Sequence, residues 1–255
     1  AYASTLVSMK LGLPVLFGIP VGAVAAGLAG LLVAPILRLS GHFLAIATLA
    51  LGEIIFLLML NLKSLTNGAY GVYGIPLPGI AGREIESEEA FFALFSIVLL
   101  LVFLGLRRLQ GSRFGRSLIA VRENELAAIA AGVSPFRQKA WAFVIGTGCA
   151  GIAGSLYAHY MAYINPEGFT FHVSVQMVTM VVIGGLGSLA GGIVGAFAVI
   201  LLPEFLRVLA DFRLVVYGAL IVGFMMFLPG GLADLGRRAA AWLLVRVADR
   251  RAVPR

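Results

Sequence analysis

Charged residues are scarce in this sequence: only 12% of its 255 residues are Asp, Glu, Lys or Arg, whereas 60% are hydrophobic. Soluble domains carry about 25% charged and about 45–50% apolar residues. The chain therefore has too few polar side chains to cover a water-soluble globule, which leaves lipid as its solvent. Its 32 glycines agree with this, because glycine is common where membrane helices pack closely.

Cysteine is nearly absent, and so are the motifs of common catalytic sites. Cys149, the single cysteine, can form neither an internal disulfide nor a cysteine-based zinc site, so we read it as a packing residue. His159 and His172 lack carboxylate or cysteine neighbours at metal-site spacing, which indicates interface residues rather than a metal site. The sequence contains no Gly-Lys-Ser/Thr loop and no Gly-x-Ser-x-Gly elbow. We therefore expect a non-enzyme that does not hydrolyse ATP itself, with no cofactor and no metal.

Long apolar runs are abundant, and a membrane-spanning helix needs about 20 such residues. The run Val173–Leu202 is too long for one helix and contains five glycines in the nine residues Gly184–Gly192. Each glycine weakens a helix interior by up to about 1 kcal/mol relative to Ala. We predict an irregular connection there. The predicted helices of this all-α, polytopic membrane protein are Leu13–Leu37, Phe43–Asn61, Ala90–Leu106, Gln138–Ala162, Val173–Ile183, Ile193–Leu206 and Phe212–Leu228.

Basic residues cluster beside the apolar runs and predict the orientation. The coupling loop, Arg107–Lys139, holds seven basic and two acidic residues, and the tail from Asp234 holds six and two. Both should be cytoplasmic by the positive-inside rule, whereas the outer loop, Leu62–Glu89, is net acidic and should face outward. The basic charge thus indicates a bilayer rather than nucleic acid as partner. We divide the chain into a membrane domain, 1–234, and a basic cytoplasmic tail, 235–255.

Counting of crossings supports the break in the glycine-rich run. An even number of crossings must separate the coupling loop from the tail, and only a turn within Gly184–Gly192 supplies it. Counting back from the coupling loop places Ala1 outside. The sequence also starts without Met or a compact signal peptide, so we expect that an odd number of upstream helices precedes it.

The coupling loop contains a predicted short helix that is too short and too polar to span the membrane. Asn124 is a good N-cap, Glu125 suits the first turn, and Gly132 suits the end. Leu126, Ile129 and Ala130 then share one face. Such a helix is suited to dock in a groove of a soluble partner, or alternatively to rest on lipid headgroups.

Three further features are candidates for the translocation pathway or its entrance. Glu53 lies in the middle of a span, where a substrate ammonium, a helix-packing hydrogen bond or an intersubunit partner would explain it. Glycines and prolines in Leu65–Gly79 predict an irregular loop whose Tyr70 and Tyr73 line a vestibule or docking surface, or lie in the interfacial aromatic belt. The glycine-rich break either lines a cavity or lets two helices cross closely. The candidate pathway residues are Glu53, Thr48, Gly184, Gly185, Gly187 and Ser188.

Several long segments resemble LivM-type permeases, in order, over roughly Ala1 to Asp234. They are GHFLAIATLALGEIIFLL, SLTNGAYGVYGIP, GRSLIAVRENELAAIAAGV and AGIAGSLYAHYMAYINPEGFTF followed by VVIGGLGSLAGGIVGAFAVILLPE. The chain start resembles a point after the first helices of that family. Residues Glu125, Ala127, Ala128 and Gly132 resemble the E-x-A-A-x-x-x-G core of the importer coupling motif, although its terminal Leu-Pro is absent.

The resemblance implies half of the membrane channel of an ABC importer of branched-chain amino acids in a bacterial inner membrane. It implies four kinds of partner: a LivH-type second permease, two cytoplasmic ATPase subunits, a periplasmic substrate-binding protein and the bilayer. The ATPase-coupling residues would be Asn124, Glu125, Leu126, Ala127, Ala128, Ile129 and Gly132. Relatives of the family carry urea, short amides or aromatic acids, and an ion-coupled secondary transporter that uses Glu53 is a further alternative.

Overall fold

The computed structural model describes residues 1–12, 14–39, 41–80, 83–85 and 87–205, together with the single positions 218, 223, 231, 232 and 234. The predicted helix Phe212–Leu228 and the tail 235–255 therefore lie outside the described residues, apart from two isolated positions of that helix. The chain divides into two compact units, Ala1–Phe171 and His172–Arg255, and each is described by itself.

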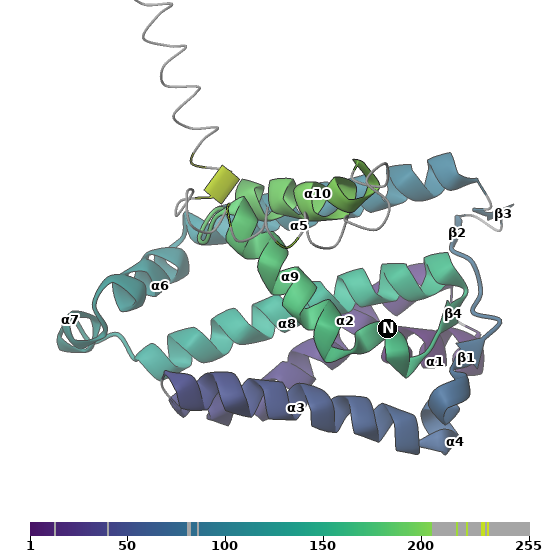
Figure 1. Cartoon of the computed structure of the whole chain (residues 1–255), viewed down its shortest axis with the longest axis horizontal. Helices are drawn as coiled ribbons and strands as arrows, with labels where there is room; N and C mark the ends of the chain where they lie inside the picture. Colours follow the sequence, from purple (N-terminus) through teal and green to yellow (C-terminus); the bar gives the residue numbers. More distant parts are fainter. Residues whose placement is uncertain are drawn as a thin grey trace, which may run out of the picture. The chain divides into compact units, whose positions relative to one another are not determined.

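The first unit contains the four long apolar helices that the sequence predicts, which confirms the all-α membrane fold (Figure 1). α5 is longer at both ends than predicted because its ends are well capped. The Oγ of its N-cap Ser87 accepts a hydrogen bond from the Ala90 amide, and arginines in the last turn suit the negative end of the helix. The four helices are α2 (Val15–Val33), α3 (His42–Asn61), α5 (Glu88–Gln110) and α8 (Pro135–Met161).

The end of α2 lies beside the start of α8. α2 continues into a 3₁₀ turn, η1 (Ala34–Arg38), whose second residue is Pro35. The Arg38 guanidinium stands 4.8 Å from the centre of the Phe136 ring, in the first turn of α8. This contact places Arg38 at the same end of the unit as the coupling loop.

A helix that the sequence analysis missed opens the chain: α1 (Tyr2–Leu11). Ser4, Thr5 and Ser8 are its buried residues, so its small polar side chains face the protein rather than solvent. α1 packs against α2 and α8. Its polar character hid it from a search for apolar runs.

α2 and α8 form the most extensive helix pair of the unit, and they meet through small residues. A Cβ added to Gly22 would clash with Ser155 Oγ, and one added to Gly30 would clash with Thr147 Oγ1. A Cβ added to Gly151 on α8 would clash in the same way with the Gly22 carbonyl. Close backbone approach through small residues is a common way to associate helices in lipid, where apolar burial gives little driving force.

The outer loop has more regular structure than the prediction of an irregular segment allowed. It contains the short helix α4 (Lys63–Thr66), the 3₁₀ turn η2 (Gly68–Tyr70) and the strands β1 (Val72–Tyr73), β2 (Gly79–Ile80) and β3 (Arg83–Glu84). β2 pairs with β3, and β1 pairs antiparallel with β4 (Tyr163–Ile164), which directly follows α8. Gly71, at φ 73°, permits this pairing because a side chain there would clash with the Ile164 carbonyl.

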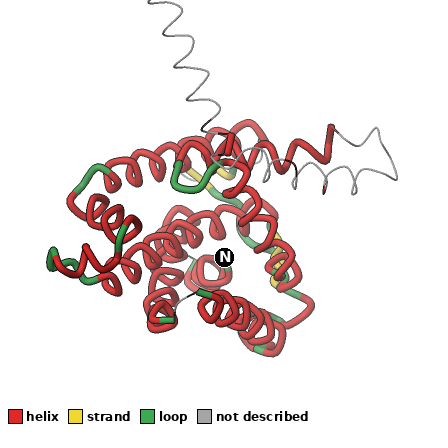
Figure 2. The backbone as a smooth tube through the Cα atoms, turned by 60° about the vertical axis from the view of Figure 1, so that its left-hand side comes forward, coloured by secondary structure: helices red, strands yellow, loops and turns green. Residues whose placement is uncertain are grey.

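The two predicted sides of the membrane are at opposite ends of the first unit. The outer loop, β4 and the 3₁₀ turn η3 (Pro166–Phe169) lie at one end (Figure 1). The coupling loop forms two helices at the other end, α6 (Arg113–Glu123) and α7 (Glu125–Ala130). In the tube view, strands are confined to short pieces and helix makes up most of the described chain (Figure 2).

In the second unit, the break within the glycine-rich run is confirmed but is shorter than predicted. α9 (Phe171–Gly184) and α10 (Leu189–Phe205) are separated by only Gly185–Ser188. Gly184, Gly191 and Gly192 are helical, contrary to the prediction that all of Gly184–Gly192 is irregular. Gly184 and Gly191 pack directly against each other, because a Cβ on Gly184 would clash with the Gly191 carbonyl and one on Gly191 with the Gly184 carbonyl.

Candidate functional site

α7 presents an apolar ridge away from the rest of the described chain. Leu126 is 79% exposed and Ile129 is 53% exposed, and Ala130 beside them is exposed as well. Ala128, on the other side of the helix, is buried with only 3% exposed. The helix is anchored by its small residue and leaves its large apolar residues uncovered, which suits a surface that another protein covers.

Both ends of α7 are fixed by local hydrogen bonds, as the sequence predicts. The Asn124 side chain accepts from the Ala127 amide at 3.0 Å, which confirms it as N-cap. At the other end the amides of Gly132 and Val133 donate to the carbonyls of Ile129 and Ala128, both at 2.9 Å. Gly132 has φ 79°, a conformation that explains why glycine ends this helix.

Contacts with α6 and α8 hold α7 in place. Lys139 Nζ in α8 donates to Glu125 Oε2 at 2.8 Å, and this exposed ion pair ties the first turn of α7 to α8. α6, which the sequence analysis missed, packs against both α7 and α8. Ser112 caps α6, and Phe114, Leu118 and Val121 mark the more buried side of the helix. The spacing of these three apolar residues is the sequence signal that could have predicted α6.

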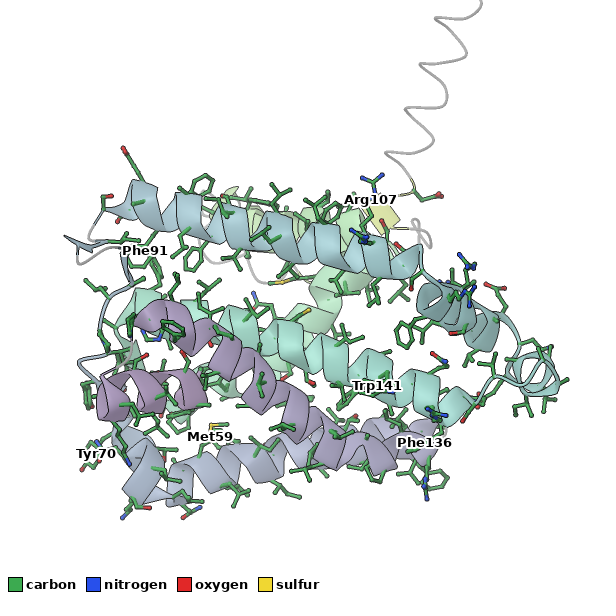
Figure 3. The ribbon with its side chains drawn as sticks, turned by 180° about the vertical axis from the view of Figure 1, so that it is seen from behind. Met59, Tyr70, Phe91, Arg107, Phe136 and Trp141 are labelled. Carbon is green, nitrogen blue, oxygen red and sulfur yellow. The ribbon has the colours of Figure 1, made fainter. Side chains whose placement is uncertain are left out.

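The end that carries α6 and α7 is strongly basic. Arg107, labelled in Figure 3, lies in the last turn of α5 where that helix approaches α6. The arginines are exposed, so their charge is available to water, headgroups or an acidic partner. They are Arg107, Arg108, Arg113, Arg116, Arg122 and Arg137.

The candidate pathway residues on α3 do not form a site with each other. Thr48 Oγ1 donates back to the carbonyls of Leu44 and Ala45 in its own helix. Glu53 is exposed, and five residues of helix turn it about 140° away from Thr48. A charged carboxylate at the bilayer centre costs a few kcal/mol unless it is covered or neutralised, so the surroundings of Glu53 need an explanation.

The other four candidates meet in the turn between α9 and α10. Gly185 and Gly187 have φ of 112° and 88°, which glycine adopts without strain. Ser188 Oγ accepts from the Gly191 amide at 3.0 Å and so caps α10. With Gly184 packed against Gly191, this geometry favours the close helix crossing over the cavity that we also considered.

A buried polar cluster joins three parts of the first unit, and sequence reasoning missed it. His159, predicted at the membrane interface, is instead 1% exposed. Its Nδ1 lies 2.9 Å from the Pro76 carbonyl oxygen and its Nε2 lies 3.0 Å from Ser4 Oγ. Because a carbonyl can only accept, Nδ1 carries the proton, and in the neutral ring Nε2 accepts from the Ser4 hydroxyl.

Small residues surround this cluster, and their spacing is the signal that could have revealed it. Ser155 Oγ donates to the Gly151 carbonyl at 2.9 Å, and a Cβ added to Gly18 would lie 2.6 Å from Ser4 Oγ. A small cavity beside His159 is lined by residues of α2, α5 and α8 and by Pro78. Small residues four apart recur in the pairs Ser4 and Ser8, Gly18 and Gly22, and Gly151 and Ser155.

The outer end carries a stacked pair of aromatic rings. Tyr73 and Tyr163 stack with 4.8 Å between ring centres, and the Tyr163 hydroxyl donates to the Tyr70 carbonyl at 3.2 Å. Loss of hydration, then the neighbouring Tyr73, raises the pKa of Tyr163 above its ordinary value, so this phenol stays a neutral donor. Tyr70 and Tyr73 are exposed, which fits either a docking surface or an interfacial belt.

A metal centre has no support in the part of the chain that the structure describes. Among those residues no group of three or more His, Cys, Asp or Glu side chains could hold an ion.

Comparison with known sequences identifies one family. The profile described as "Branched-chain amino acid transport system / permease component" matches residues 1–228. No solved structure matches the chain.

Relatives with curated names are permeases of two kinds. The high-affinity branched-chain amino acid transport system permease protein LivM of Escherichia coli (strain K12) is 34% identical over 261 residues, covering 93% of this chain and 61% of the relative. The corresponding LivH protein of Salmonella typhimurium is 31% identical over 202 residues, covering 74% of this chain and 62% of the relative. A probable LivM protein of Methanocaldococcus jannaschii is 28% identical over 176 residues. The chain thus spans about three fifths of the length of the first two of these relatives.

Proposed function

Because the chain belongs to the family of branched-chain amino acid transport permease components, we propose that it is one of two membrane chains of an ABC importer. It would form half of the channel that translocates branched-chain or other hydrophobic amino acids. The observation that carries this proposal is the extent of the family match, which reaches from residue 1 to residue 228. The likeness to LivM proteins over 93% of the chain supports the LivM-type role in particular.

The likeness to two kinds of permease supports a paired assembly. The chain resembles both LivM and LivH proteins, and both carry the name of the high-affinity branched-chain amino acid transport system. We propose that a LivH-type chain of the same fold completes the channel. Such a pair has approximate two-fold symmetry, so each chain would present related surfaces to the other.

We propose that partner subunits hydrolyse the ATP. The sequence contains no nucleotide-binding loop, and the exposed ridge of α7 supplies a surface for transmitting motion from a soluble ATPase. We propose that Leu126 and Ile129 insert into a groove of that subunit, with Ala128, Asn124 and Gly132 fixing the helix. The remaining coupling residues, Glu125 and Ala127, hold the first turn.

The proposed location is a bacterial inner membrane, with α7 in the cytoplasm. The basic coupling loop supports this orientation, because cytoplasmic loops carry an excess of Lys and Arg. A periplasmic binding protein would then deliver substrate to the opposite end, where the outer loop and β4 form an ordered surface. Because relatives of the family carry urea, short amides or aromatic acids, these compounds are the alternative substrates for this chain.

Reconstitution in liposomes tests the proposal. The chain alone should give no uptake of labelled leucine, whereas the chain with a LivH-type permease, two ATPases and a binding protein from the same operon should give ATP-dependent uptake. Omission of ATP from the full complex is the matched control. Saturable leucine uptake by the isolated chain without ATP would contradict the proposal, and competition by urea or phenylacetate would reassign the cargo.

A further inference from the structure

α8 connects the two ends of the first unit that the proposed function assigns to different partners. Its 27 residues make a helix about 40 Å long, which exceeds the hydrocarbon thickness of about 30 Å. Figure 1 shows α8 running from the end that carries α7 to the end that carries β1 and β4. The residues Ala131–Ser134 separate α7 from its start, and Ala162 separates its end from β4.

The inner end of α8 is bonded to α7. Lys139 Nζ, in the second turn of α8, donates to Glu125 Oε2 in the first turn of α7 at 2.8 Å. The short connection between the two helices is bonded to α7 as well, because the amides of Gly132 and Val133 donate to α7 carbonyls. α6 packs against both helices. A displacement of α7 therefore moves the start of α8 with it.

The outer end of α8 is bonded to the outer loop. His159, in the last turn of the helix, donates from Nδ1 to the Pro76 carbonyl at 2.9 Å. The neighbouring loop residue, Ile75, is buried in one apolar cluster with Ala158, and its amide donates to the Ala162 carbonyl at 3.3 Å. Of these two hydrogen bonds, the one from His159 starts within the helix, whereas Ala162 follows it in a left-handed conformation.

Between its two ends α8 is supported by α2. Four glycines lie between residues 146 and 154 and would weaken an isolated helix. The α2 backbone packs directly against this stretch: a Cβ on Gly22 would clash with Ser155 Oγ, and one on Gly30 would clash with Thr147 Oγ1. Close-packed contacts of this kind transmit a displacement instead of absorbing it.

α5 also joins the outer loop to the coupling loop, but its packing makes it the weaker connection. Against the described residues Phe91 is the only buried residue of α5, whereas α8 has four buried residues. Phe91 and Phe95 contact the Tyr160 ring edge-on, so the start of α5 itself packs against the end of α8. At its other end α5 is followed by α6, which places α7 one helix further away.

We infer that α8 transmits movement of α7 to the outer loop, and that His159 is the positioning residue at the outer end of this route. A movement that an ATPase imposes on α7 passes to α8 at Lys139, along the α2–α8 pair, and to the loop at Pro76. By thermodynamic linkage, a binding protein that moves the outer loop changes the state of α7 with the same coupling free energy. The inference rests on the proposed function and adds the route between the two ends.

Replacement of His159 separates the two sides of the imidazole. An Asn amide reaches the position of Nδ1 and donates to the Pro76 carbonyl, whereas a Gln amide reaches the position of Nε2 and keeps the bond to Ser4. His159→Gln therefore removes the bond to the outer loop, and His159→Asn removes the bond to α1. Ser4→Ala removes the bond to α1 from its other partner and is the matched control.

Distance distributions in the full chain, without ATP or partners, test whether α7 and the outer loop form one body. Nitroxide labels are attached to Tyr70→Cys and Ala131→Cys, both at exposed positions, in a Cys149→Ala background. Double electron–electron resonance is then recorded in nanodiscs. We expect one narrow distribution for the unsubstituted imidazole, His159→Asn and Ser4→Ala, and at least twice that width for His159→Gln. Equal widths in all four proteins would overturn the inference.

ATP hydrolysis by the assembled importer tests the transmission itself. The measured quantity is the factor by which the leucine-loaded binding protein stimulates hydrolysis. It is taken on complexes isolated by size-exclusion chromatography, so that unfolded or unassembled protein does not contribute. We expect His159→Gln to lower this factor at least fivefold, and His159→Asn and Ser4→Ala to keep it within twofold of the unsubstituted complex.

The outcomes separate this inference from the proposed function. Stimulation that is unchanged in His159→Gln, or that falls equally in His159→Gln and Ser4→Ala, would refute transmission through the Pro76 bond. An unsubstituted complex that shows no stimulation contradicts the proposed function instead. In that case the label distances still decide whether α8 holds α7 and the outer loop as one body.

Discussion

His159 Nδ1 lies 2.9 Å from the carbonyl oxygen of Pro76, although 83 residues separate them in the sequence. This bond joins the end of α8 to the outer loop, and the opposite ring nitrogen joins α8 to Ser4 of α1. One buried imidazole therefore joins three segments that lie far apart in the sequence.

Replacement of this imidazole should destabilise the first unit. In His159→Leu the Pro76 carbonyl and the Ser4 hydroxyl both lose their partner, and an unsatisfied buried polar group costs about 1–3 kcal/mol. We expect a loss of about 2 kcal/mol or more, measured as a lower midpoint of SDS-induced unfolding in mixed micelles. His172→Leu, at an exposed position, is the matched control and should change the midpoint little. Equal effects of the two variants would refute a structural role for the cluster.

The contact between α2 and α8 gives a second prediction. Gly22→Ala should lower stability by about 1–3 kcal/mol, because the new methyl group clashes with Ser155 Oγ and with the Gly151 carbonyl. Adding Ser155→Gly removes the nearer clash and should restore part of the loss. Gly105→Ala is the matched control: its Cβ meets nothing, so helix propensity should leave it neutral or stabilise it by up to about 1 kcal/mol. A double-mutant cycle on unfolding midpoints checks this, and strict additivity of Gly22→Ala and Ser155→Gly would count against direct contact.

The sequence predicted the long helices and the α7 cap well, because length, apolar content and capping are local properties. Leu13–Leu37, for instance, coincides with α2 and its 3₁₀ extension within two residues. Prediction from the sequence failed where polar side chains bind partners that lie far away along the chain. α1 is stabilised by its burial against α2 and α8, and His159 is satisfied by Ser4 and Pro76, which only the folded chain brings together.

The same reasoning explains the outer loop. Glycines and prolines correctly exclude long helices there, yet β1 forms because β4, ninety residues later, offers a strand to pair with. Of the candidate sites, the α7 ridge and the glycine turn were recognisable from the sequence. The cluster around His159 was not, because its partners Ser4 and Pro76 lie 155 and 83 residues away in the sequence.

Accessibility of single cysteines should establish the predicted orientation. Ser87 and Ser112 look suitable by position, but both cap helices, so their replacement would cost about 1 kcal/mol. Tyr70 and Arg122 are exposed at opposite ends of the unit and avoid this cost. In a Cys149→Ala background, Tyr70→Cys should react with an impermeant maleimide added outside intact spheroplasts, and Arg122→Cys should react only after lysis. Labelling of both from one side would refute the assigned topology.

The last prediction concerns the exposed ridge of α7. Leu126→Asp combined with Ile129→Asp places two charges where an ATPase groove should receive apolar side chains, each of which contributes roughly 1.5–3 kcal/mol when fully buried, before the costs of association. We expect normal membrane abundance, because these residues lie outside the spans, but at least tenfold lower ATPase co-purification and no substrate-stimulated hydrolysis. Ala131→Asp, at the exposed C-cap residue that follows the helix, is the matched control and should assemble normally. A helix that only rests on lipid headgroups predicts weaker membrane contact with unchanged assembly and stimulation. Wild-type values of both ATPase recovery and stimulated hydrolysis in the double variant would therefore remove α7 from the coupling mechanism.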